Sequence, residues 1–391
     1  MKKLFRLSNL RHVSALVAIT LAIPVSWKGL TGFYSWLSPF IMLNSVFVLK
    51  SFVWLNFISV GVIIISAFRK RWFCRNLCPV GYGCDLVSGL SERNSLIHKR
   101  LPEIGKWLAV TSLLAAIAGL PLFIFLDPMA IFNGFFTFFS GKLSIPVIIS
   151  FSVLPLILIS NLFFPSVWCA KLCPLGGLQM VIFDLKYKIH SIFSEKIPAQ
   201  TEVNTGRRYF LMSGAGLLAG TMLPGFMKPS ADKFIRPPAS VEPLLFNSLC
   251  CRCGGCTKVC PTGIIRPQTD YNNILGWMTP EIDFKSGYCL ETCNLCSQVC
   301  PSGSITHFST EAKSQLFMGT AEIKLENCLL VNNKECVRCK ESCKYEAIEF
   351  VSQESLLDVI PIIKSQKCVG CGACEVVCPA GCIKVKPTFC V

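Results

Sequence analysis

Histidine is scarce in this 391-residue chain: there are four, at positions 12, 98, 190 and 307, and no two lie on one apolar segment. The sequence Cys-x-x-Cys-His is absent, which excludes a covalently attached c-type haem, and the lack of a histidine pair argues against a haem held within a membrane segment. We find no nucleotide-binding loop after a strand, no covalent flavin motif and no Ser/His/Asp set. We therefore expect no hydrolytic or nucleotide chemistry on a bulky substrate.

Acidic residues are few in the first part of the chain. Residues 1–228 contain 22 Lys and Arg but 7 Asp and Glu, whereas residues 229–391 contain 16 of each. The net charge of +15 therefore lies in the first part, beside long apolar segments. Positive charge in that setting indicates membrane topology rather than nucleic-acid binding, and residues 229–391 have no net positive charge to bring to a phosphate backbone.

Five apolar runs in the first part approach the length of about 20 residues that crosses a bilayer as a helix. They are Val13–Phe33, Ser51–Phe68, Trp107–Leu126, Ile145–Phe164 and Tyr209–Met227. We predict an all-α polytopic membrane domain, with four spans in residues 1–204 and a fifth in residues 205–228. A linker at 229–245 and an α+β domain at 246–391 follow.

The basic residues predict the orientation of these spans. The N-terminus, the segment 69–106 and the segment 165–208 hold 18 of the 22 Lys and Arg, so we place them on the cytoplasmic side. The fifth span begins with Thr205–Leu211, which includes Arg207 and Arg208 and looks like a twin-arginine translocation signal. We expect a bacterial inner-membrane protein whose residues 229–391 lie on the periplasmic side.

Cysteine is abundant, with 24 residues, and sixteen of them form four groups after residue 250. The groups are Cys250, Cys253, Cys256 and Cys260; Cys289, Cys293, Cys296 and Cys300; Cys328, Cys336, Cys339 and Cys343; and Cys368, Cys371, Cys374 and Cys378. The first, second and fourth groups end in Cys-Pro. The third has a long first spacing and Lys344 in place of the proline.

This spacing is typical of [4Fe–4S] clusters, in which the fourth cysteine of a motif binds the partner cluster. We therefore predict four clusters in two dicluster modules of a bacterial-ferredoxin-like fold. Cys300 joins the first group and Cys260 the second; Cys378 joins Cys339 with Cys328 or Cys336, and Cys343 joins the fourth group. Zinc ribbons use separated pairs, and neighbours this close in sequence cannot all form disulfides.

Two further cysteine pairs lie in the first part. Cys74 and Cys78, and Cys169 and Cys173, each stand in a Cys-x3-Cys-Pro-x-Gly motif after a predicted span. The segments before those spans also match, Leu37–Asn44 with Leu126–Asn133, so we predict a duplicated unit. Its two copies would bring the four cysteines together as ligands of an additional cluster. Cys84 is a possible extra ligand, and Cys251, Cys382 and Cys390 have no assigned role.

These motifs resemble known electron-transfer proteins. The first part is similar to NapH-type membrane proteins with four spans and two Cys-x3-Cys-Pro motifs, and the second to NapG- and MauM-type ferredoxins, which share the twin-arginine start, four cluster motifs and stretches like Met278–Ile282 and Met318–Ala321. The chain looks like a fusion of the two. The resemblance implies transfer of electrons from membrane quinol towards a periplasmic reductase.

Three functions are compatible with the sequence. The first is oxidation of quinol near the membrane domain, as in a quinol dehydrogenase, with electrons relayed to a reductase or cytochrome; the apolar segments 38–48 and 127–139 are candidates for the quinone pocket. The second is electron delivery from a cytoplasmic donor through the Cys74 and Cys169 region, for maturation or reactivation of a metalloenzyme. The third is a sensor or scaffold in which clusters are structural. The expected partners are membrane lipid, the quinone pool and a redox protein, without nucleic acid.

Overall fold

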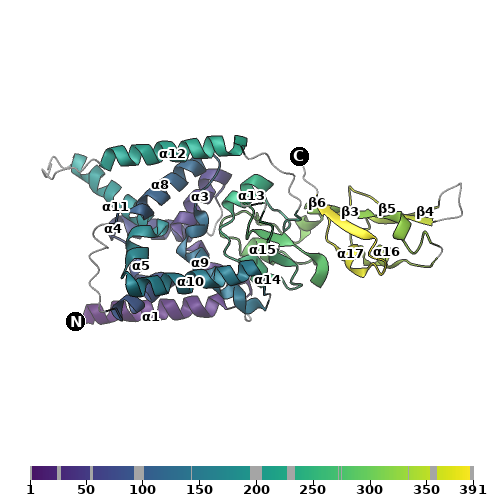
Figure 1. Cartoon of the computed structure of the whole chain (residues 1–391), viewed down its shortest axis with the longest axis horizontal. Helices are drawn as coiled ribbons and strands as arrows, with labels where there is room; N and C mark the ends of the chain where they lie inside the picture. The colour runs from purple at the N-terminus through teal and green to yellow at the C-terminus, as the bar shows by residue number, and fades with distance from the viewer. Residues whose placement is uncertain are drawn as a thin grey trace.

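The computed structural model describes residues 2–23, 28–52, 56–91, 101–141, 143–193, 205–226, 234–271, 273, 275–332, 334–352 and 359–387. A helical half is followed by an elongated half that carries the small sheets (Figure 1). The unassigned Cys390 and residues 229–233 of the predicted linker lie outside the described residues.

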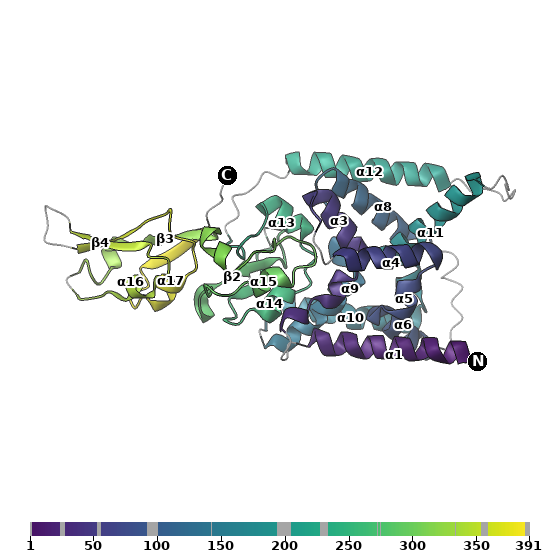
Figure 2. The same ribbon diagram turned by 180° about the vertical axis from the view of Figure 1, so that it is seen from behind.

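Ten helices of five or more residues are described in the helical half. They are α1 (Lys2–Ala22), α3 (Pro39–Leu49), α4 (Asn56–Phe68), α5 (Trp72–Asn76), α6 (Pro79–Gly89), α8 (Ile104–Ile117), α9 (Pro128–Phe135), α10 (Ile145–Phe163), α11 (Pro174–Phe193) and α12 (Thr205–Phe226). Helices α1 and α12 lie on opposite sides of the bundle in both views, and the N-terminus is at the end away from the second half (Figures 1 and 2).

Most of the predicted spans contain an apolar helical segment that is shorter than a bilayer requires. In the described part of the chain, α10 is long and apolar enough to cross a membrane, whereas Leu10–Ala22, Asn56–Phe68, Ile104–Ile117 and Leu211–Met222 are apolar but shorter. The first span, predicted to reach Phe33, ends as a helix at Ala22, and α8 ends nine residues before the predicted Leu126. Gly119 adopts a φ of 101°, which ends α8, and Pro121 follows.

The predicted duplication is visible in the helix starts. Helices α3 and α9 each begin with proline after a capping residue: Ser38 accepts the backbone N–H of Ile41, and Asp127 accepts that of Met129 at 2.8 Å. The two capping side chains meet in the core, where the Ser38 hydroxyl donates to the Asp127 carboxylate and both residues are fully buried. The matching segments of the two copies are therefore packed against each other.

The second half contains α13 (Pro243–Leu249), α14 (Gly255–Val259), α15 (Leu295–Gln298), α16 (Arg338–Ser342) and α17 (Ala373–Val377). Its strands are β1 (Ile265–Pro267), β2 (Pro280–Ile282), β3 (Gly319–Ile323), β4 (Ile348–Ser352), β5 (Val359–Ile363) and β6 (Ile383–Pro387). They form three antiparallel pairs, β1–β2, β3–β6 and β4–β5.

The strand pairing repeats between the two cysteine modules. In the first module, β1 follows one motif and pairs with β2 before the next, while a single bridge joins Ser240 to Ile305 on the outer flanks. In the second module, β4 and β5 form the inner pair and β3 and β6 the outer pair. The buried Ile235 packs in the same core as Ile264 and Ile305, so the folded unit begins before residue 246.

Candidate metal centres

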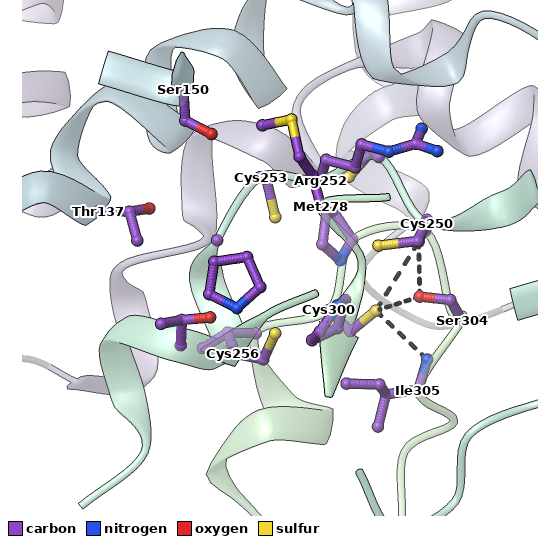
Figure 3. A pocket seen from close by; sticks show the side chains of 18 of the residues that line it. Thr137, Ser150, Cys250, Arg252, Cys253, Cys256, Met278, Cys300, Ser304 and Ile305 are labelled. Atoms are coloured by element: carbon purple, nitrogen blue, oxygen red, sulfur yellow. Dashed lines mark hydrogen bonds between the residues drawn. The ribbon is translucent and has the colours of Figure 1, made fainter. Parts of the chain in front are cut away.

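The first cavity is lined by Cys250, Cys253, Cys256 and Cys300 (Figure 3). These are the four cysteines that the sequence groups together when the fourth cysteine of each motif binds the partner cluster. Three come from the loop and helix around α14, and Cys300 comes from the end of the next motif. The cavity measures about 580 Å³. The backbone N–H of Ile305 donates to the Cys300 sulfur at 3.4 Å, so the strand after the second motif supports a thiol of the first cavity.

Three other cavities repeat this arrangement. Cys289, Cys293, Cys296 and Cys260 line the second, of about 360 Å³, and Cys368, Cys371, Cys374 and Cys343 line the fourth, of the same volume. Cys328, Cys336, Cys339 and Cys378 line the third, of about 380 Å³. Every fourth cysteine thus crosses to the partner motif.

The third cavity contains both cysteines that the sequence left as alternatives, and one more. Cys328 and Cys336 both line it, as does Cys382, whose sulfur lies 3.4 Å from that of Cys378. Cys328 lines the same cavity beside Cys382. The sequence assigned no role to Cys382, although its position four residues after Cys378 at the entry to β6 points back towards the motif.

The geometry fits a cluster better than a single ion. Within the described part of the chain, no three His, Cys, Asp or Glu side chains converge closely enough to hold one metal ion. Four thiols instead surround each of four cavities. Burial raises the pKa of Cys250 to about 12 and that of Cys371 to about 11, so binding of a metal group at neutral pH must displace the thiol protons.

The spatial order of the four cavities differs from their order in the sequence. The first lies next to the helical half, with α14 and α15, and the module with α16 and α17 lies farther out (Figures 1 and 2). The backbone N–H of Cys289 donates to the carbonyl of Cys371 at 2.9 Å, which joins the second cavity to the fourth. The third cavity, with α16 and β4, is the outermost. The row is therefore first, second, fourth, third.

The four cysteines of the helical half are also brought together. Cys74, Cys78, Cys169 and Cys173 lie close enough that a charge on one thiol acts on the others. The backbone N–H of Gly81 donates to Cys78 at 3.2 Å, and that of Gly176 donates to Cys173 at 3.4 Å. These equivalent hydrogen bonds show that the two Cys-x3-Cys-Pro-x-Gly motifs have the same local conformation.

The other two thiols, Cys74 and Cys169, are each approached by a buried polar side chain at an equivalent position in the two copies. Ser66 donates to the Gln179 side chain at 3.3 Å, and the Gln179 amide donates to Cys74 at 3.1 Å. In the other copy, Asn161 donates to Cys84 at 3.4 Å, and Cys84 lies near Cys169. Gln179 and Cys84 each stand six residues after the cysteine that precedes proline, and both are fully buried. Gln179 was not predicted as a site residue, although its position equivalent to Cys84 is visible in the sequence.

Comparisons with known proteins identify the chemistry of these sites. Family models described as a 4Fe-4S binding domain match residues 51–98 with 143–194 and residues 359–380, and one described as a 4Fe-4S dicluster domain matches residues 249–304. The ferredoxin-type protein NapF of Escherichia coli K12 is 34% identical over 158 residues, which cover 40% of this chain and 87% of NapF.

Two other relatives agree. NapG of the same strain is 32% identical over 203 residues, covering 46% of this chain and 86% of NapG. The methylamine utilization ferredoxin-type protein MauM of Methylophilus methylotrophus is 30% identical over 154 residues, covering 38% of this chain and 67% of MauM. The chain belongs to this family of ferredoxin-type proteins. No solved structure matches it.

A ferredoxin-type protein carries iron–sulfur clusters and transfers electrons to and from other redox proteins, and this holds for the chain described here. The similarity to NapF, NapG and MauM covers less than half of the chain. The NapH-type resemblance of residues 1–204 and the number of clusters therefore remain predictions.

Proposed function

We propose that this ferredoxin-type protein is bound to the bacterial inner membrane and passes electrons from quinol to a periplasmic reductase or cytochrome. The observation that carries the proposal is the row of four-cysteine cavities that begins against an apolar helical half and extends away from it. Each [4Fe–4S] cluster, when bound, supplies uptake and release of one electron at a time.

The thiols of each cavity are the proposed ligands. Four groups of four hold one cluster each, and Cys382 supports the third site from beside Cys378. The polypeptide spaces these sites and sets their potentials through N–H···S bonds, burial and nearby charge. Ala321 and Ala347, for example, donate backbone N–H groups to Cys368 at 3.5 Å and Cys343 at 3.3 Å.

Membrane attachment is supported by the exposed apolar side chains of the helical half. Helix α10 presents Ile145, Ile148, Leu156 and Ile159 at its surface, each between 44% and 62% exposed. A surface of this kind is costly in water and is solvated by lipid. Lipid is thus a proposed partner, with the basic segments 69–106 and 165–208 on the cytoplasmic side.

The apolar segments considered for a quinone pocket fold into the core. Segment 38–48 forms most of α3, and segment 127–139 forms α9 and the turn after it, with Phe40, Ile41 and Met129 fully buried. These residues pack the domain. Thr137 of the second segment, however, lines the first cavity, so this end of the helical half is the part nearest to a proposed ligand set.

Anaerobic purification and reduction test the proposal. The full chain in detergent should be brown and contain about 16 iron atoms for four clusters, or about 20 with a fifth at the helical-half cysteines. A menaquinol analogue should then reduce the clusters, as seen by loss of visible absorption and by EPR. A colourless or zinc-loaded protein, or clusters that the quinol analogue fails to reduce, would refute it.

A second function is favoured by the cysteines of the helical half. Ser150 of α10 lines the first cavity and Asn161 of the same helix donates to Cys84 beside Cys169. Eleven residues separate them, so the two sites are about 16 Å apart along the helix axis. A cytoplasmic donor could therefore deliver electrons across the helical half. Reduction by a cytoplasmic reductant, with no reduction by quinol, would establish this route.

A further inference from the structure

The first cavity differs from the other three in what encloses it. Its lining includes Thr137, Val147 and Ser150 of the helical half, in addition to the four cysteines (Figure 3). It is also the largest, at about 580 Å³ against 360 to 380 Å³. The other three are lined within residues 234–391. One site is thus built jointly by the two halves.

The joint wall is fixed in place by buried contacts. The ammonium group of Lys258, which is 7% exposed, donates to the backbone carbonyls of Ala22 and Asn133 at 3.3 and 3.2 Å and also to the Asn133 side chain. The Ser45 hydroxyl donates to the carbonyl of Ser302 at 2.8 Å. These contacts join α14 and the second motif to the helical half. They therefore hold Thr137, Val147 and Ser150 at fixed positions in the lining of the cavity.

The two halves also approach each other closely at two glycine residues. Gly254 has a φ of 67°, and a methyl group built on it would overlap the Thr137 hydroxyl. Gly32 lies against the backbone carbonyl of Val299, where a side chain would again overlap it. Glycine at these two positions lets the cluster-binding loop approach the helical half within contact distance.

Two polar groups of the wall lack partners. The Thr137 hydroxyl and the Asn133 amide nitrogen have no hydrogen-bond partner among the described residues, although both residues are 3% exposed. Thr137 lines the cavity, and the Asn133 side chain lies near the Cys253 thiol. Buried donors without acceptors are rare because their desolvation is uncompensated. An acceptor placed in the cavity would resolve this.

We propose that Thr137 and Asn133 of the helical half donate hydrogen bonds to the sulfur atoms of the group held by Cys250, Cys253, Cys256 and Cys300. The inference rests on the proposed function in that it requires a cluster at this site. Hydrogen bonds to cluster sulfurs stabilise the more negative, reduced form and raise the reduction potential. The helical half therefore sets the potential of the first site, which makes it the junction between the two halves.

The variant Thr137→Val tests the proposal, because it removes the hydroxyl and retains the branched shape. Full-length protein, purified without oxygen in detergent, is titrated with dithionite and redox mediators and followed by EPR. One reduction step should move to lower potential by roughly a tenfold change in its equilibrium constant, or about 59 mV for one electron. The remaining steps and the iron content should not change, and Thr137→Ser should restore the wild-type value.

Thr221→Val is the matched control, since that hydroxyl on α12 donates within its own helix at 3.0 Å to Leu217 and should affect no potential. Unchanged potentials in Thr137→Val at full iron content would overturn the proposal. So would an unchanged potential with a weaker response to a menaquinol analogue, which would assign the hydroxyl to quinol. Chemical titration needs no quinol, so a failure of quinol to reduce the wild-type protein affects the proposed function alone.

Discussion

Lys258 is the charged side chain that most directly joins the cluster-binding half to the helical half, and its replacement gives a sharp prediction. Lys258→Met keeps a side chain of similar length and removes the ammonium group. The carbonyls of Ala22 and Asn133 then lose a buried donor. No thiol ligand is removed, although the first cavity loses a positive charge near Cys253 and Cys256.

The magnitude follows from the bonds that are lost. An acceptor left unsatisfied in a buried site costs about 1–3 kcal/mol. Three acceptors are affected, the two carbonyls and the side-chain oxygen of Asn133, but the variant also no longer buries a charge, which offsets part of the loss. We expect the docked state to lose about 2 kcal/mol relative to the undocked state, which corresponds to roughly a 30-fold shift in the opening equilibrium.

Hydrogen exchange measured by mass spectrometry on the full cluster-loaded chain is the assay. Peptides that cover α9 and α14 should exchange roughly 30-fold faster in Lys258→Met, whereas peptides of β4 should keep their wild-type rates because they lie in the outer module. Lys313→Met is the matched control. Lys313 is 2% exposed and donates to the carbonyls of Leu290 and Cys293 within the second motif, away from the junction.

Lys313→Met should therefore speed exchange around Leu290 and leave α9 protected. If Lys258→Met left the exchange of α9 within about threefold of the wild type, the lysine would not hold the two halves together, and the argument that the wall of the first cavity is fixed would be wrong. Equal effects of both variants on α9 would likewise show a general loss of stability rather than a local one.

Four further outcomes are expected. Cys328→Ser should lower the iron content by about four atoms per chain, whereas Cys382→Ser should retain it, as measured by iron analysis; equal losses would make Cys382 a ligand. Gly254→Ala should weaken docking, as measured by the exchange of α9, because its methyl group would overlap the Thr137 hydroxyl; its left-handed backbone conformation costs about 1–2 kcal/mol in addition. Gln179→Leu should lower the potential of any cluster at Cys74 without loss of iron, and an unchanged titration would refute that role. Removal of iron by a chelator under oxidising conditions should unfold residues 234–387 while the helical half keeps its far-UV signal; a half that stays folded would contradict the view that metal bonds supply its stability.

Part of the site was predictable because it depends on short-range chain geometry. Three cysteines within seven residues can face one cavity whatever surrounds them, and the fourth cysteine of a motif binds the cluster of the neighbouring motif. The groupings around Cys300, Cys260, Cys343 and Cys378 follow from that rule, and the structure brings together the same sets. The family models agree on the chemistry.

The helix boundaries were less predictable. Apolar runs predicted spans through Phe33 and Leu126, yet α1 ends at Ala22 and α8 at Ile117, the latter because Gly119 takes a positive φ and the chain turns before α9. Hydropathy reports how apolar a segment is. It does not report whether the backbone remains helical, which depends on single residues that favour a turn.

The sequence by itself predicted the kind of cofactor, the cysteine sets around the first, second and fourth motifs and the duplication in the helical half, because all three depend on local spacing. Only the tertiary structure decided that the cavity of the third motif is farthest from the helical half and that Thr137 lines the first cavity. Those facts depend on contacts such as Cys289 with Cys371 and Lys258 with Asn133, which join residues 82 and 125 positions apart. Contacts at such separations arise from packing of whole elements, and no spacing rule within a motif contains them.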